Sequence, residues 1–191
     1  MRSQLIIGTA GHIDHGKTTL IHALCGKQLD STPEEKERGI TINLGFADKT
    51  LPSGKKVSFI DVPGHEKLIR TMISGATSMD AVLLCVSAVD GVMPQTKEHL
   101  SILKLLGIKQ GLIALTMSDL VDEEMIELAL LDIEELIEGS FLEGAPIIIT
   151  SAGQAPIGID ELEQQLDSIQ VESKASEQPF RISVDRCFVQ K

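Results

Sequence analysis

Tryptophan and tyrosine are absent from the sequence, and phenylalanine occurs only five times among its 191 residues. Proteins that hold single-stranded nucleic acid by stacking need several aromatic side chains, so a platform of that kind is not expected. Cysteine is also scarce, because only Cys25, Cys85 and Cys187 occur and they lie far apart. Their odd number and wide spacing favour a reduced, cytoplasmic protein over a disulfide framework or a cysteine-based metal site.

The sequence also lacks long hydrophobic runs and has a deficit of positive charge. No segment approaches the ~18 apolar residues of a membrane span, and the apolar stretch near the start is too short for a signal peptide. Lysine and arginine number 17 against 28 aspartates and glutamates, so the formal net charge is −11. A field of that sign opposes unassisted binding to nucleic acid or acidic membranes. We therefore expect no membrane partner and no DNA partner.

Short apolar runs alternate with helical patterns over most of the chain. Strands are expected at residues 5–7, 57–60, 80–86, 111–115 and 146–149, and helices at 17–24, 65–77, 95–106, 122–138 and 158–169. Nearly continuous apolar strands separated by helices predict a mostly parallel sheet with helices on both faces. With right-handed crossovers, this pattern is typical of a doubly wound α/β domain, which we expect to span residues 1–170.

Four segments fall outside this alternation. Residues 51–55 contain the turn formers proline and glycine and predict a hairpin turn between two strands. Residues 28–40 are polar without a sustained apolar period and predict a long loop, of a kind that is usually functional or disordered. Residues 171–179 are expected to be a linker. Residues 180–191 alternate as a strand that has no partner, so we expect them to be the truncated first strand of a following domain.

One motif indicates a phosphate site. The segment Gly11-His12-Ile13-Asp14-His15-Gly16-Lys17-Thr18 fits G-x-x-x-x-G-K-[ST] and lies between an expected strand and an expected helix. Its glycines let backbone amides curl around an anion, and the helix N-terminus adds its dipole. The lysine reaches the β- and γ-phosphates and the threonine offers a hydroxyl to Mg²⁺. The expected phosphate-binding residues are Asp14, His15, Gly16, Lys17, Thr18, Thr19 and, from the next motif, Gly64.

A second motif, Asp61-Val62-Pro63-Gly64, follows the expected strand 57–60. An aspartate at the end of an adjacent parallel strand can hold Mg²⁺ through water, and Gly64 lets its amide approach a γ-phosphate closely. The same aspartate also suits a capping role on the helix 65–77, and the two roles are compatible. Thr41 is a second hydroxyl that can complete the metal shell when a triphosphate is bound, although a threonine taken without its neighbours is more often a strand residue than a metal ligand. The expected Mg²⁺ ligands are thus Thr18, Thr41 and Asp61.

Together these residues resemble the translational GTPases. The similar segments are residues 11–20, 38–42, 61–66 and 90–99, and the resemblance spans residues 4–170. Within that family, residues 39–47 and 59–67 are more similar to the selenocysteine-specific elongation factors than to elongation factor Tu. Residues 179–186 resemble the first strand of that branch's second domain, a β-barrel. The resemblance implies a P-loop NTPase fold of the G-domain type.

The resemblance also implies an activity. The domain is expected to be a GTP-binding switch that hydrolyses GTP slowly, with Lys17 and His65 as catalytic residues. His65 takes the family's water-orienting position, and Ile13 and Ile40 match the apolar gate beside it. A lone histidine at this place would equally suit a helix start. The full protein is expected to bind GTP and GDP and to deliver selenocysteyl-tRNA to the ribosome, which repositions His65.

The guanine site departs from the family pattern. The family reads guanine with Asn/Thr-Lys-x-Asp, whereas this strand ends in Thr116-Met117-Ser118-Asp119. Asp119 can accept hydrogen bonds from the guanine N1–H and amino group, both of which adenine lacks. Met117 supplies an apolar contact but no ammonium, a loss of about 1–3 kcal/mol, or roughly 5- to 150-fold in affinity. A backbone amide of Ser151 or Ala152 matches the family's contact to guanine O6.

Three accounts of Met117 remain open at this point. The site is weaker but still guanine-specific, or another feature compensates, or the domain is a degenerate module with weak or no hydrolysis. Besides the GTPase and the degenerate module, an ATPase that uses the same phosphate loop is a further functional hypothesis. Asp119 argues against it, because its carboxylate would face the lone pair of a ring nitrogen of adenine, which is unfavourable.

The helix expected at 122–138 has no basic residue and carries acidic side chains along its length. We expect a solvated acidic face and an apolar side that packs on the core. That apolar side is expected to be supplied by Met125, Leu128, Ala129, Leu131 and Leu136.

Overall fold

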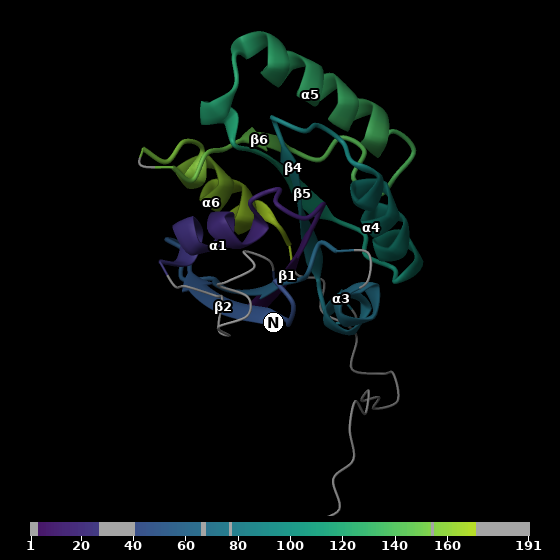
Figure 1. Ribbon diagram of the computed structural model, residues 1–191. Helices are drawn as coiled ribbons and strands as arrows, with labels where there is room; N and C mark the ends of the chain where they lie inside the picture. Colours follow the sequence, from purple (N-terminus) through teal and green to yellow (C-terminus); the bar gives the residue numbers. More distant parts are fainter. Residues whose placement is uncertain (1–3, 27–40, 66–67, 77, 154, 171–191) are drawn as a thin grey trace, which may run out of the picture.

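The computed structural model describes residues 4–26, 41–65, 68–76, 78–153 and 155–170, and these form one six-stranded sheet with helices on both sides (Figure 1). The strands follow the order β2-β3-β1-β4-β5-β6. Their bounds are Gln4–Ala10 (β1), Gly45–Thr50 (β2), Lys56–Asp61 (β3), Ala81–Ser87 (β4), Gly111–Thr116 (β5) and Ile147–Ile149 (β6). All neighbouring pairs are parallel except β2 with β3, which form an antiparallel hairpin.

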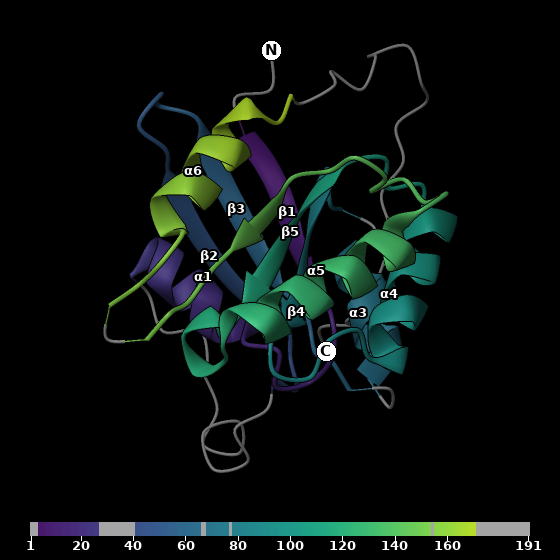
Figure 2. The same cartoon turned by 90° about the horizontal axis from the view of Figure 1, so that it is seen from above.

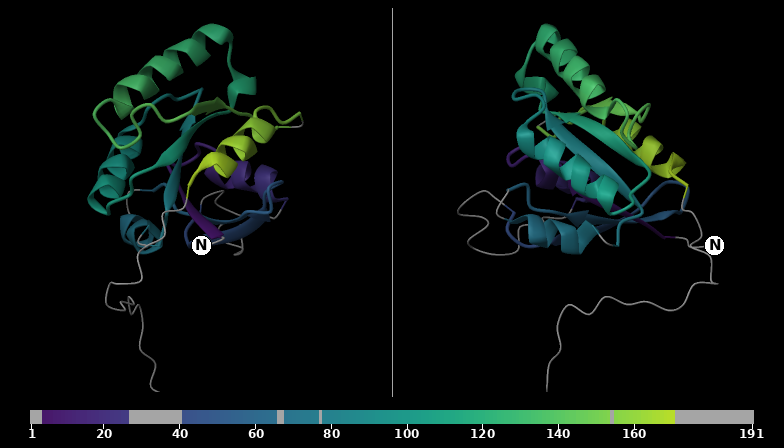
Figure 3. Two further views of the ribbon diagram at one scale, coloured as in Figure 1. Left: turned by 180° about the vertical axis from the view of Figure 1, so that it is seen from behind. Right: turned by 90° about the vertical axis from the view of Figure 1, so that its right-hand side faces the viewer.

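Five helices of the described chain cover the two faces of this sheet (Figures 2 and 3). The helices α1 (Lys17–Cys25) and α6 (Ile159–Ser168) lie on one face. The helices α3 (Ile69–Ala76), α4 (Pro94–Leu105) and α5 (Glu123–Ile137) lie on the other. The doubly wound, mostly parallel α/β fold expected from the sequence is confirmed.

Strand β4 shows why the sequence forms this arrangement. All seven of its residues are buried, as expected for a central strand covered on both faces. Ala81, Leu83 and Cys85 pack with α1 and α6, whereas the alternate residues Val82, Leu84 and Val86 pack with the helices of the other face. The side-chain period of two therefore feeds two separate cores from one strand. The β-branched and leucine side chains of this strand therefore contribute to the cores on both faces of the sheet.

The parallel strands place their carboxyl ends at one edge of the sheet. Asp61 ends β3, Ser87 ends β4 and Thr116 ends β5, and the segment 11–16 follows β1 at the same edge. Open α/β sheets bind ligands in the crevice at this edge. The fold thus gathers the motifs of the sequence at one place, although they lie more than a hundred positions apart.

Most predicted element boundaries agree with the structure to within one residue, and the exceptions are β1, which extends to Ala10 instead of ending at residue 7, and the start of α3. A helix was expected from residue 65, but α3 begins at Ile69, and before it the amide of Leu68 donates to the carbonyl of His65 (2.8 Å). The turn at 51–55 is confirmed by the Leu51 amide bond to the Lys55 carbonyl (2.9 Å). The loop expected at 28–40, the linker 171–179 and the strand 180–191 lie outside the described residues. None of the described helices has the length and apolar character needed to cross a membrane.

The apolar side expected for the acidic helix α5 is narrower than the sequence indicated. Ala129 is buried, as are Ile133 and Ile137, at a spacing of four residues along one stripe. Met125, Leu128 and Leu131 are instead 40%, 52% and 61% exposed. The helix lies at the outer end of its layer (Figure 1), so only the stripe that faces the sheet is covered. The prediction for these three side chains was therefore wrong.

Two phenylalanines of the β2–β3 hairpin provide a matched test of the core. Phe59 is fully buried, whereas Phe46, on the partner strand, is 68% exposed. Replacing Phe59 by alanine is expected to lower the free energy of unfolding by about 3–5 kcal/mol, because a large cavity remains. The same change at Phe46 is expected to alter the free energy of unfolding by no more than about 0.5 kcal/mol. Urea denaturation measures both, and equal losses would contradict the packing described.

Candidate functional site

The loop between β1 and α1 has a backbone shape that only certain residues permit. Gly11 has φ 128°, and a Cβ there would lie 2.2 Å from the carbonyl oxygen of Cys85. Gly16 is the N-cap of α1 and adopts the left-handed conformation, φ 69°. Asp14 reaches φ 60° without being glycine. The two fixed glycines of the motif are therefore required by close backbone approach and by a positive φ.

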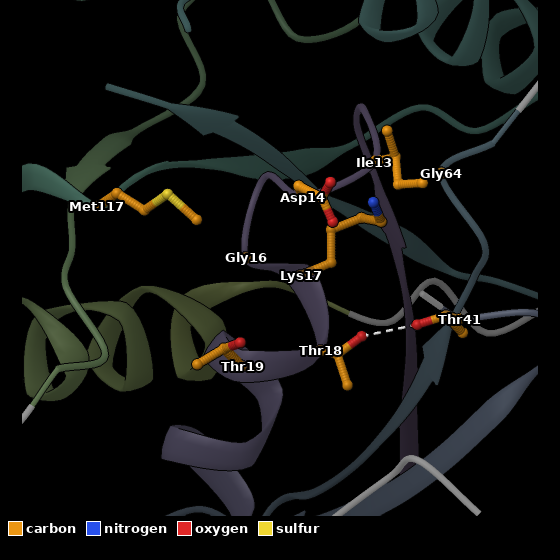
Figure 4. A pocket seen from close by; sticks show the side chains of 9 residues that line it. All are labelled: Ile13, Asp14, Gly16, Lys17, Thr18, Thr19, Thr41, Gly64 and Met117. Carbon is orange, nitrogen blue, oxygen red and sulfur yellow. Dashed lines mark hydrogen bonds between the residues drawn. The ribbon is translucent and has the colours of Figure 1, made fainter. Parts of the chain in front are cut away.

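A cavity of about 280 Å³ opens beside this loop (Figure 4). The N-terminus of α1 borders it, so amides and the positive end of the helix dipole are available to an anion. Of the expected phosphate-binding residues, His15 alone does not line it. The lining residues are Ile13, Asp14, Gly16, Lys17, Thr18, Thr19, Thr41, Gly64 and Met117.

Lys17 places a buried ammonium group at this cavity. The residue is only 6% exposed, and its Nζ donates to the carbonyl oxygen of His12 at 2.5 Å. Burial lowers the pKa of the Lys17 ammonium, against smaller opposing effects that include the charges of Asp61 and Asp14. A cation held out of water is costly unless a negative charge compensates it. The arrangement therefore favours an anionic ligand.

Gly64 closes the cavity against the loop. A Cβ at this position would lie 2.4 Å from the Lys17 Nζ and 2.7 Å from the backbone nitrogen of Ile13. The second of these neighbours is backbone and cannot move aside cheaply. Only glycine lets the segment after β3 lie this close to the phosphate loop.

Three oxygen-bearing side chains meet beside the cavity: Thr18 and Thr41 line it, whereas Asp61 is not among its lining residues. The Thr18 hydroxyl donates to Asp61 Oδ2 at 2.6 Å and lies 2.8 Å from the Thr41 hydroxyl (Figure 4). Asp61 is fully buried and also accepts from Thr9 Oγ1 at 2.8 Å. The hard oxygen donors of this set suit Mg²⁺. No cluster of three or more His, Cys, Asp or Glu side chains arranged for a metal occurs among the described residues.

Thr9 is a member of this network that sequence reasoning missed. Its hydroxyl orients the Asp61 carboxylate and accepts a hydrogen bond from the Val62 amide at 3.0 Å. A threonine inside a buried strand carries no sequence signal for such a role. The role depends on β1 and β3 being neighbours in the sheet.

The expected hydrolytic residues are only partly placed. His65 follows Gly64 directly and is half-buried, but it is not among the residues that line the cavity. Ile13 does line it, whereas Ile40, its expected partner in the apolar gate, lies outside the described residues. The catalytic role of His65 stays a prediction.

A second cavity, of about 200 Å³, adjoins the first. Gly16, Thr19 and Met117 line both of them, so a ligand can extend from one into the other. The loops after β5 and β6 form its far wall. Its other lining residues are Leu20, Thr116, Asp119, Leu120, Thr150, Ala152 and Gly153.

Asp119 lies in this second cavity opposite the loop after β6. A Cβ at Gly153 would lie 2.8 Å from Asp119 Oδ2, so the loop after β6 lies directly beside the carboxylate. Sequence reasoning named Asp119 but missed Gly153, Leu20 and Leu120. The only available signal for Gly153 was its position directly after Ser151 and Ala152, which the family resemblance singles out.

The structure separates the two candidates for the contact to a base oxygen. The Ser151 amide donates to the carbonyl of Ile157 at 3.1 Å, in an isolated β-bridge. Ser151 is buried and does not line the cavity. The expectation for Ser151 is therefore corrected, and Ala152, which lines the cavity, is the better candidate.

Met117 lies where the two cavities join. It adopts a left-handed conformation, φ 58°, which is uncommon for a residue other than glycine. Ser87 Oγ donates to its sulfur at 3.6 Å. A Cβ added to Gly16 would lie 3.6 Å from Met117 Cε, so the methyl end lies over the phosphate loop (Figure 4). Thr116, just before it, ties β5 to the loop through the His15 carbonyl (3.0 Å).

Two buried histidines hold the back of the loop. His15 Nδ1 accepts from the Ser87 amide at 3.2 Å, and His99 Nδ1 accepts from the Gly11 amide at 3.1 Å. Burial, together with the positive charges nearby, lowers the pKa of each imidazole to about 4. Both rings are therefore neutral near pH 7. The His15 ring faces the core, so only its backbone can take part in phosphate binding.

Comparison with known proteins places this geometry in a family. The model of the elongation factor Tu GTP-binding domain matches residues 2–171. The selenocysteine-specific elongation factors of Desulfomicrobium baculatum and Escherichia coli are 49% and 43% identical, each over 98% of this chain and 30% of their own length. The translation initiation factor 2 subunit gamma of Thermococcus onnurineus is 43% identical over 79% of this chain and 42% of its own length.

Solved structures agree with the sequence comparison. A bacterial selenocysteine-specific elongation factor superposes with a TM-score of 0.81 at 41% identity, over 87% of this chain and 29% of that one. The elongation factor SelB of Methanococcus maripaludis, in complex with the GTP analogue GPPNHP, gives 0.73 at 31% identity, over 87% and 34%. The chain thus spans about 30% of the length of the selenocysteine-specific relatives. It belongs to the translational GTPases, as a GTP-binding domain of the elongation factor Tu type.

Proposed function

We propose that this chain is the GTP-binding and GTP-hydrolysing switch domain of a selenocysteine-specific elongation factor. The observation that carries the proposal is the junction of two cavities, one holding the Lys17 ammonium and the other the Asp119 carboxylate. A charged phosphate tail and a purine with two adjacent donors complement these two groups. The family membership supports GTP as that ligand.

In this proposal the phosphates occupy the first cavity. Amides of residues 14–19 bind the phosphate oxygens, and Lys17 stabilises the charge shared by the β- and γ-phosphates. Thr18 and Asp61 hold Mg²⁺, with Thr41 joining when a γ-phosphate is present. When bound, the ion neutralises charge on the phosphates. The Gly64 amide contributes a contact to the γ-phosphate that disappears after hydrolysis.

Hydrolysis is assigned to His65 acting on a water molecule. The imidazole orients the water toward the γ-phosphorus. Ile13 and Ile40 keep the His65 side chain away from that water until the ribosome repositions His65. Because His65 does not line the cavity here, turnover by the domain alone is expected to be slow.

The base occupies the second cavity. Asp119 accepts from the guanine N1–H and amino group, and the Ala152 amide donates to O6. Met117 covers the face of the base with a polarizable thioether in place of the family's lysine side chain.

The role of the whole protein is inferred from its relatives. The similarity to selenocysteine-specific elongation factors supports delivery of selenocysteyl-tRNA to the ribosome in the cytoplasm. The initiation factor 2 gamma subunits are also similar, at 41–43% identity over 79–95% of this chain, so it is the 49% identity to the Desulfomicrobium baculatum factor that favours the selenocysteine-specific role. Residues 171–179 and 180–191 are proposed to lead into a β-barrel domain that follows.

Met117 also supports a second candidate, a guanine-nucleotide sensor that does not hydrolyse its ligand. Its thioether has no charge to interact with a nucleotide or to brace the phosphate loop. Binding without turnover would fit this second function.

Calorimetric titration with GTP, GDP and ATP, with and without Mg²⁺, tests the proposal. We expect both guanine nucleotides to bind, Mg²⁺ to tighten GTP, and ATP to bind at least about a hundredfold more weakly because Asp119 rejects adenine. An Asp119→Ala control is expected to lose guanine preference. Tight ATP binding would contradict the assignment, and GTP binding without any phosphate release would favour the sensor.

Substituting Met117 by lysine restores the ammonium of the family pattern. We expect GDP to bind about 5- to 150-fold more tightly, because the charge gains a hydrogen-bonding contact at the junction of the cavities. Met117→Leu keeps the apolar contact and is the matched control, expected to change little. If the lysine variant bound GDP no better than the leucine variant, the missing ammonium would be irrelevant to affinity.

A further inference from the structure

We propose that His99 is a positioning residue for the phosphate site, acting through the Gly11 amide. The inference rests on the proposed function, because the site it supports is the nucleotide phosphate cavity. His99 lies in α4, far from that cavity in sequence, and is not among the cavity's lining residues. Its side chain is 1% exposed.

The contact is made at the first turn of the loop. Gly11 N donates to His99 Nδ1 at 3.1 Å, across 88 positions of sequence. On its other side Gly11 lies close to β4, since a Cβ at this position would lie 2.2 Å from the Cys85 carbonyl oxygen. The acceptor on one side and the strand on the other therefore fix the direction in which the loop leaves β1.

The next residue carries this constraint to the cavity. His12 follows Gly11, and its carbonyl oxygen accepts from the Lys17 Nζ at 2.5 Å. A change in the Gly11 amide plane moves that carbonyl and with it the ammonium group. The path from α4 to the phosphate cavity thus runs through His99 Nδ1, the Gly11 amide, the His12 carbonyl and the Lys17 Nζ.

The chemistry of the ring suits this role. To accept from Gly11, His99 must be neutral with its proton on Nε2. Burial, together with the charges of Lys17 and His12, lowers the pKa of His99 to about 4, which keeps it in that form at pH 7. A protonated ring would turn a donor toward the donor of Gly11.

A matched pair of amide variants tests the acceptor. His99→Asn places an oxygen near the position of Nδ1, whereas His99→Gln places it near Nε2. We expect the asparagine variant to bind GDP like the wild type and the glutamine variant to bind about tenfold more weakly. The ratio of GDP to inosine diphosphate affinity, which reports on Asp119, should stay the same in both. Equal GDP affinity in the two variants would overturn the proposal, even if both variants lost the same amount of thermal stability.

A measurement on the wild-type protein tests the same contact without requiring that either variant folds. The scalar coupling across the N–H···N bond, between Gly11 N and His99 Nδ1, is observable by NMR and should persist when GDP binds. Its absence would overturn the proposal even if both variants unfolded. If the wild type bound no guanine nucleotide, the proposed function would fail and the positioning role would fall with it. If it bound GDP but the coupling was absent, only the role of His99 would fail.

Discussion

The buried ammonium of Lys17 is the constraint on which the rest of the site depends. A cation that is 6% exposed and donates to one carbonyl at 2.5 Å destabilises a protein unless an anion compensates it. The loop glycines, the start of α1 and the close approach of Gly64 all shape the cavity around that group. The domain therefore keeps a positive charge in a buried place, and the negative charge of a phosphate chain would compensate it.

In the proposed function, the second cavity adds recognition of a base to the binding of phosphates. Because Gly16, Thr19 and Met117 line both cavities, a ligand held by its phosphates is led toward Asp119. Met117 is the residue at which this chain departs from the family pattern. Its sulfur accepts from Ser87, at the end of β4, so the side chain keeps a defined place without the ammonium. In the proposed function, affinity and specificity are carried by different residues, so the departure at Met117 is expected to affect nucleotide affinity more than base specificity.

Sequence reasoning succeeded where the chemistry is local. The phosphate loop and the start of α1 follow from a spacing of eight residues between a strand and a helix. The convergence of Thr18 and Asp61 was also expected, since carboxyl ends of parallel strands share an edge. Thr9 and Gly153 were missed because their roles depend on the neighbouring strand or loop. Of the two candidates for the contact to guanine O6, Ser151 is disfavoured because its amide donates to the carbonyl of Ile157, and the exposure of Leu131 reflects where α5 lies.

The most direct measurement of the central claim is calorimetric titration of a Lys17→Met variant with GDP and Mg²⁺, alongside urea unfolding of the nucleotide-free protein. Methionine preserves much of the side-chain volume but removes the charge. The account predicts that GDP affinity falls by about a hundredfold or more, while the nucleotide-free variant is at least as stable as the wild type, because a buried cation is gone. Undiminished GDP affinity, or a marked loss of stability with binding intact, would contradict it.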